Sequence, residues 1–91
     1  MPTIAEALRA EMLRTGAADV WAGDPDLCLS AYENAGGSLA HPLNRIKATI
    51  DAARRSPLFV RSGYIRACDS SGTREILHPC FTLKELQPPQ K

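Results

Sequence analysis

Hydrophobic side chains recur at helical spacing near the beginning of the chain. Between residues 4 and 15 they fall every three or four positions, which places them on one face of an α-helix. Thr3 and Glu6 have the spacing of a capping box, in which the two side chains satisfy free backbone N–H groups at a helix start. Gly16 follows as a residue suited to a left-handed helix end. The pattern predicts a first helix over residues 4–15.

Two further stretches repeat this pattern. Asp24 and Pro25 are typical of a helix start, with Asp24 expected to cap the helix, and the apolar face that follows stops at Gly36-Gly37. From Pro42 to Arg55, hydrophobic side chains are spaced by three, four and three residues. The pair Ser56-Pro57 then stops the helical pattern. We therefore expect a short second helix and a longer third one.

The periodicity changes after the third helix. Residues 58–68 and 74–83 are rich in β-branched and aromatic side chains, and residues 69–73 between them form a polar cluster with a glycine. This arrangement predicts a β-hairpin. Pro79 confines the second strand to an edge or a bulge. Residues 17–23 lie between two glycines and predict an extended connector with a brief edge strand.

Together these elements predict an α+β fold in which three helices precede a two-stranded antiparallel hairpin. The chain has 91 residues, of which 44% are hydrophobic and 23% are charged, so its size and composition suit one globular domain. We assign that domain to residues 1–84 and expect residues 85–91 to form a flexible tail. A domain of this size rarely builds a deep catalytic cleft, and we do not expect an enzyme.

The composition also bears on cellular location. No apolar run is long enough to span a membrane, and the first residues lack the charged and apolar regions of a secretory signal. Three cysteines form an odd number without a CxxC pair, which favours a reducing compartment over a disulfide scaffold. We therefore expect a cytoplasmic protein that does not contact membranes.

Charge is distributed unevenly along the chain. Residues 1–40 contain two basic and six acidic side chains, whereas residues 41–91 contain nine basic and four acidic ones. The predicted third helix and hairpin are therefore the electropositive half. Guanidinium groups bind phosphate oxygens in bidentate geometry, and an arginine-rich helix beside an arginine-bearing hairpin suits binding to a phosphate backbone. The alternative is a solvated face that only keeps a small domain soluble.

The electropositive half supplies the candidate binding residues. On the third helix, Asn44 and Arg45 have the side-chain types that contact adenine and guanine in the major groove. We expect the other basic side chains to contact phosphates. The complete predicted DNA-binding set is Asn44, Arg45, Lys47, Arg54, Arg55, Arg61, Arg66 and Arg74.

The order of helix, short strand, two helices and hairpin resembles the winged helix-turn-helix superfamily. The passage from Leu58 to Arg66, which ends in Arg61-Ser62-Gly63-Tyr64-Ile65-Arg66, is similar to the segment by which such domains pass from the recognition helix into the wing. The resemblance implies that residues 42–55 are the recognition helix and residues 68–74 the wing tip. It further implies a small DNA-binding protein, a transcriptional regulator or accessory factor of bacterial or phage type. Asp51 departs from this pattern, because a carboxylate in the reading face repels phosphate.

A protein-interaction module is the alternative function. Its basic face would dock on an acidic protein surface of a larger nucleic-acid-handling machine. The acidic first half opposite a basic second half can also drive association of two copies, so a homodimer stays open. We expect Trp21 to pack in the core or at an edge, and Tyr64 to pack the hairpin on the third helix unless it faces outward for stacking.

Metal and nucleophile chemistry receive little support. Cys28, Cys68, His78 and Cys80 have ligand chemistry for zinc, but their spacing contains neither a CxxC nor an HxxxH motif. A cysteine nucleophile also needs an orienting group and a pocket that the sequence does not indicate. We expect no cofactor, no metal and no catalytic residue.

Overall fold

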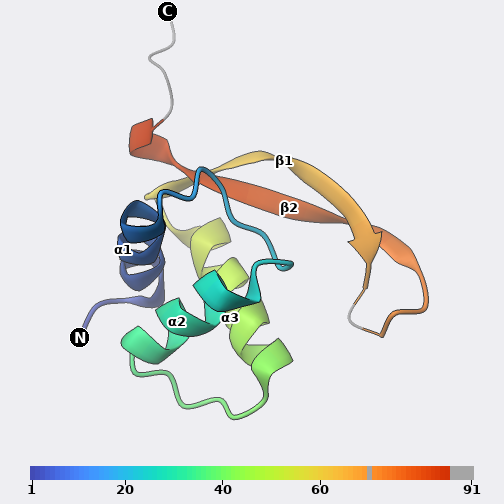
Figure 1. Cartoon of the computed structure of the whole chain (residues 1–91), viewed down its shortest axis with the longest axis horizontal. Coiled ribbons are helices and arrows are strands. Elements are labelled where there is room, and N and C mark those ends of the chain that lie inside the picture. Colours follow the sequence, from blue (N-terminus) through green and yellow to red (C-terminus); the bar gives the residue numbers. More distant parts are fainter. Residues whose placement is uncertain (70, 87–91) are drawn as a thin grey trace, which may run out of the picture.

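Three helices precede a two-stranded hairpin in the computed structural model, which describes residues 1–69 and 71–86 (Figure 1). The predicted α+β fold class is confirmed. The elements are α1 (Ile4–Thr15), α2 (Pro25–Asn34), α3 (Pro42–Arg55), β1 (Phe59–Cys68) and β2 (Glu75–Leu83).

The beginning and end of α1 follow the predicted chemistry. The backbone N–H of Thr3 donates to Glu6 Oε1 at 2.8 Å, and the backbone N–H of Glu6 donates to Thr3 Oγ1 at 3.1 Å. Gly16 ends the helix with a φ of 75°, a conformation that costs side-chain-bearing residues energy and glycine little. The capping box and the glycine stop are both confirmed.

The start of α2 differs from the prediction for Asp24. The backbone of Asp24 stands at the cap position, but its side chain makes no hydrogen bond to the helix. Its Oδ2 instead accepts from the backbone N–H of Trp21 at 3.1 Å, and its own N–H donates to the Trp21 carbonyl at 3.0 Å. The capping role predicted for this carboxylate is therefore wrong, because it is used to close the turn that precedes the helix.

The hairpin pairs β1 with β2 in antiparallel register, with an irregularity between Arg61 and Gly63. The predicted brief edge strand is reduced to one residue. Val20 exchanges two backbone hydrogen bonds with Phe81 of β2, at 2.8 and 2.9 Å. This bridge fixes the segment between α1 and α2 along the edge of β2 opposite β1.

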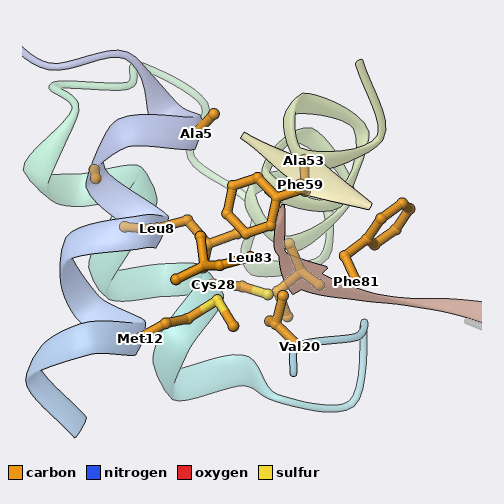
Figure 2. Packing of buried hydrophobic residues seen from close by; sticks show 12 residues of the cluster. Ala5, Leu8, Met12, Val20, Cys28, Ala53, Phe59, Phe81 and Leu83 are labelled. Atoms are coloured by element: carbon orange, nitrogen blue, oxygen red, sulfur yellow. The ribbon is translucent and has the colours of Figure 1, made fainter. Parts of the chain in front are cut away.

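The near end of the hairpin is where β1 begins and β2 ends, and the far end is where Cys68 pairs with Glu75. The core lies where the near end meets the helices. In Figure 2, Leu8 and Met12 project from α1 toward Leu83, Phe59 and Cys28. All five side chains are at most 6% exposed. The far end of the hairpin extends beyond the helices in Figure 1, so only its near end takes part in this core.

Thr49 connects α3 to α2 inside the protein. Its side chain is fully buried, and its hydroxyl lies 3.1 Å from the Cys28 carbonyl of α2 and 2.9 Å from the Arg45 carbonyl of its own helix. Because a buried hydroxyl requires such a partner, the contact favours one rotation of α3 about its axis. That rotation decides which side chains of α3 face outward.

The chain continues past β2 in a 3₁₀ turn over Lys84–Leu86. Arg9 of α1 holds this turn through two hydrogen bonds to Glu85, at 2.5 and 3.1 Å. Glu85, assigned to a flexible tail from the sequence, thus contacts α1. The remainder of that predicted tail, residues 87–91, lies outside the described residues.

Candidate nucleic-acid interface

One side of α3 carries most of the predicted binding residues. We call it the open face of α3 and define it by Asn44, Lys47, Asp51, Arg54 and Arg55. Of these, Asn44, Lys47, Arg54 and Arg55 are exposed, and Asp51 is half-buried. At about 100° per residue these positions fall on one half of the helix surface. The structure therefore brings four of the eight predicted residues together on one helix.

Asp51 is engaged with arginines of its own helix. Its carboxylate contacts Arg54 Nη2 at 2.5 Å and Arg55 Nη2 at 2.6 Å. The hydrogen bond from Arg54, together with the charges of both guanidiniums, lowers the pKa of Asp51. Asp51 therefore stays ionised near neutral pH and holds two guanidiniums at the surface. The open face of α3 still has three cations for one acid.

Arg45 lies on the other flank of α3. Its Nε donates to the Leu39 carbonyl at 2.6 Å, and its guanidinium carbon lies 5.9 Å from the ring centre of Tyr32. The hydroxyl of Tyr32 accepts from the Leu39 backbone N–H at 2.9 Å. Arg45 thus fixes the loop between α2 and α3, and in this conformation its guanidinium is not directed at the open face where we expected a base contact.

The hairpin arginines form a second group. Arg61 and Arg66 are exposed on β1, and Arg61 lies 5.0 Å from the ring centre of Tyr64. Tyr64 is 52% exposed, so the expectation that it packs the hairpin on α3 is wrong. Leu77, the cross-strand partner of Arg66, is also exposed. We call this surface the outer face of the hairpin.

Side chains alternate between the two faces of a strand, and the opposite face of the hairpin turns toward α3. Ala67, Ile76 and His78 line a groove between the hairpin and α3. The register therefore places Arg66 on the face of the hairpin opposite Ile76, which lines the groove together with Lys47 and Arg54 of α3.

Arg74 stands at the hairpin turn, apart from both surfaces. Its Nε lies 3.8 Å from Asp69. Asp69 also accepts hydrogen bonds from the Ser71 hydroxyl at 2.6 Å and from the backbone N–H groups of Ser71 and Thr73. The Ser71 hydrogen bond is the largest of the contacts that lower the pKa of Asp69. The turn therefore carries a fixed negative charge beside Arg74.

The groove itself was not expected from the sequence. It has a volume of about 520 Å³ and runs between α3, the far end of the hairpin and the Trp21–Gly23 segment. The residues by which α3 lines the groove include Leu43 and Ile50, which lie next to the buried face of the helix. Their spacing of seven residues, together with a tryptophan two residues before Gly23, was the available signal. Only the tertiary structure shows that they meet the hairpin.

Both arginines of the first half pair with nearby acids. Arg14 contacts Glu11 at 2.7 Å, and Arg9 contacts Glu85 at 2.5 Å. Over residues 1–69 and 71–86, no acid of the first forty residues forms an ion pair with a base of the second half. Among the described residues, the bases of the electropositive half therefore pair only with its own Asp51 and Asp69, and its Glu85 pairs with Arg9.

Comparison with known proteins does not add a family. No protein-family model, curated protein or solved structure matches the chain. Within the described part of the chain, no helix is long and apolar enough to cross a membrane, and no group of three His, Cys, Asp or Glu side chains could hold a metal ion. The case for a function therefore depends on the surfaces described above.

Proposed function

We propose that the protein binds double-stranded DNA through the open face of α3, with the hairpin beside the duplex. The observation that carries this proposal is the arrangement of Lys47, Arg54 and Arg55 on one exposed helix surface with Asp51 as their single acid. A surface with this excess of cations attracts polyanions.

The order of the elements supports the same proposal. Val20 pairs with β2 between α1 and α2, and α3 leads directly into β1. This is the order that made the sequence resemble winged helix-turn-helix proteins, and in that resemblance α3 takes the place of the recognition helix. The proposal retains the cytoplasmic location and the regulatory or accessory role expected from the sequence.

Each basic side chain of the open face has a defined part in the proposed complex. Arg54 and Arg55 bind phosphate oxygens from the positions in which Asp51 holds them. Lys47 contributes a third phosphate contact, and Asn44 is the remaining candidate for contact with a base edge. Arg61 and Arg66 reach the duplex only where it extends past the hairpin, because they lie on its outer face.

Phosphate contacts make the affinity depend on salt. Three such contacts release condensed counterions, and the logarithm of the association constant falls with the logarithm of salt concentration with a slope of about −3. Between about 50 and 200 mM salt this corresponds to a loss of roughly 40-fold in affinity. Further contacts from the hairpin would make the slope steeper.

The test is a fluorescence anisotropy titration of a labelled mixed-sequence duplex two helical turns long. Arg54→Ala combined with Arg55→Ala should weaken binding about tenfold or more and reduce the salt slope by about 2, because two phosphate contacts are lost. Asp51→Asn should strengthen binding, because it removes the only carboxylate of the open face.

Arg14→Ala is the matched control. Arg14 is an exposed arginine that is also paired with a nearby acid, but it lies at the end of α1. Its replacement should leave the affinity for DNA unchanged. Binding that is absent at low salt, or that responds equally to the Arg14 variant and the Arg54/Arg55 variant, would overturn the proposal.

A further inference from the structure

The groove between α3 and the hairpin has the size and lining of a small-molecule site. Its volume of about 520 Å³ lies in the range of roughly 300–1,000 Å³ found for such sites. Ile46 and Ile50 of α3 face Ile76 of the hairpin across it. A mainly apolar lining with few polar groups is typical of sites for organic ligands. Lys47, Asp51 and Arg54 of the open face also line the groove, but its apolar part does not suit a phosphate backbone.

Trp21 forms a wall of the groove that is held in place before any ligand arrives. Its backbone is fixed by two hydrogen bonds with Asp24, at 3.0 and 3.1 Å. Its indole lies against Gly23 so closely that a Cβ at that position would overlap the ring. The indole also meets the His78 ring edge to face, with centroids 5.5 Å apart. Close packing of this kind fixes an aromatic side chain in one orientation.

His78 is in turn fixed by the hairpin. Its Nε2 lies 3.0 Å from the Cys68 carbonyl, within hydrogen-bond distance. The aromatic wall therefore connects the Trp21 segment with both strands. A preformed wall lowers the entropic cost of binding, because fewer side chains have to be ordered by the ligand.

The charges at the rim decide the chemistry of the ligand. The carboxylate of Asp51 pairs with Arg54 and Arg55. The carboxylate of Asp69 accepts hydrogen bonds from Ser71 and Thr73 and lies near Arg74. Both acids of the lining therefore already have partners.

Lys47 also lines the groove, and it has neither an ion pair nor a hydrogen bond to any residue that the structure describes. Among the described residues, Lys47 is thus the one Lys or Arg of the lining without an ion-pair partner, and it lies beside an apolar lining.

We propose that this groove binds a small organic carboxylate with an apolar aliphatic or aromatic body. The body packs against Ile50, Ile76 and Trp21, where its burial removes apolar surface from water. The carboxylate pairs with the Lys47 ammonium at the rim. This inference goes beyond DNA binding and does not depend on it, because the ligand is detected directly.

Trp21 supplies the readout, since it is the only tryptophan of the chain and lines the groove. The probes are 3-cyclohexylpropanoate, the neutral 3-cyclohexylpropanamide and the cationic 3-cyclohexylpropylammonium, which share one apolar body and do not absorb where tryptophan is excited. Saturable change of Trp21 fluorescence is expected for the carboxylate. It should bind about fivefold more tightly than the amide, as expected for one partly exposed ion pair.

Lys47→Gln tests the charge, and Lys84→Gln is its matched control because Lys84 is exposed but does not line the groove. Lys47→Gln should remove the preference for the carboxylate over the amide, and Lys84→Gln should leave it unchanged. Leu43→Gln should weaken all probes, because it replaces an apolar side chain of the lining. Leu43 is 43% exposed, so this substitution leaves the core intact.

Three outcomes would overturn the inference. The first is no saturable binding of the carboxylate up to about 10 mM, a concentration above the weakest affinity of interest. The second is binding of the ammonium probe at least as tight as that of the carboxylate. The third is an equal response of the Lys47→Gln and Lys84→Gln variants to the carboxylate. Each result is independent of whether the protein binds DNA.

Discussion

The side of the molecule formed by α1 and the near end of the hairpin contrasts with the side formed by α3 and the far end. On the first side, Leu8 and Met12 are at most 1% exposed, and Arg9 is paired with Glu85. On the second side, Leu43 is 43% exposed and Lys47 has no partner among the described residues. Leu8, Met12 and Arg9 thus have partners within the protein, whereas Leu43 is half-exposed and Lys47 is unpaired among the described residues.

This contrast explains where binding is expected. Apolar and charged groups that already contact one another contribute to stability and offer little to a partner. Apolar groups that are half-exposed beside a groove, and cations without a counterion, can form the most favourable new contacts with a bound molecule. The two regions should therefore respond differently to substitution, reagents and pH.

The largest difference is expected for the leucines of the two regions. Leu8→Ala should lower the free energy of unfolding by about 2–5 kcal/mol, because it leaves a cavity in the core between α1 and the hairpin. Leu43→Ala should cost less than about 1 kcal/mol, since its side chain is already partly in water. Urea unfolding followed by circular dichroism measures both. Equal losses would show that the groove is packed as tightly as the core.

The cysteines should show a second difference. Cys28 is buried, and desolvation, with the charge of Asp24 adding to it, raises the pKa of its thiol to about 12. Cys68 is exposed at the far end of β1. With Ellman's reagent at neutral pH, Cys68 should react at once, while Cys28 should react about a hundredfold more slowly or only on unfolding, because the thiolate is the reactive form.

Cys68→Ser supplies the control for that reaction. It should remove the fast phase and leave the slow one, since Cys28 and Cys80 are both buried. A fast phase that persists in this variant would mean that the core opens on the timescale of the reagent.

The smallest effect is expected for the ion pair that joins α1 to the chain end. The hydrogen bond from Arg9 lowers the pKa of Glu85 below its ordinary value of 4.5. A depressed carboxyl pKa stabilises the folded state above the unfolded value, and this stabilisation is lost as pH falls through the lower folded value. Glu85→Gln should therefore slightly lower the urea midpoint at neutral pH and make no difference once the pH is well below 4.5.

Glu75→Gln is the comparison for that measurement, because Glu75 forms no ion pair with the residues that the structure describes. Its replacement should leave the urea midpoint nearly unchanged across the same pH range. A neutral-pH loss for Glu85→Gln that persists at low pH would show that the contact acts through packing and not through charge.

Local sequence signals predicted the elements well because they act within a few residues. The Thr3–Glu6 box, the glycine at position 16 and the proline-marked start of α3 each work through their own backbone neighbourhood. The same signals failed for Asp24, because two sets of backbone N–H groups lie close to its carboxylate in the sequence. The carboxylate accepts from the Trp21 N–H and not from the first turn of α2, and the residue spacing did not distinguish these two acceptor roles.

The candidate surfaces were predicted only in part. The sequence placed Lys47, Arg54 and Arg55 on one helix, and the helix period alone suffices to put them on one face. It could not show that Arg45 turns to the Leu39 carbonyl, because that contact depends on the path of the loop after α2. It also could not show that Arg66 and Ile76 face opposite sides of the hairpin, because this depends on the register and on the irregularity after Arg61.

By itself, the sequence determined the three helices, the hairpin and the imbalance of charge between the two halves, since periodicity, caps and composition are properties of short segments. Only the tertiary structure decided that Arg66 lies on the face of the hairpin opposite Ile76, and that an apolar groove lined by Lys47 lies between α3 and the hairpin. The physical reason is that the direction of a side chain on a hairpin depends on the pairing between its strands. A groove likewise depends on the spacing between two elements that are distant in the chain.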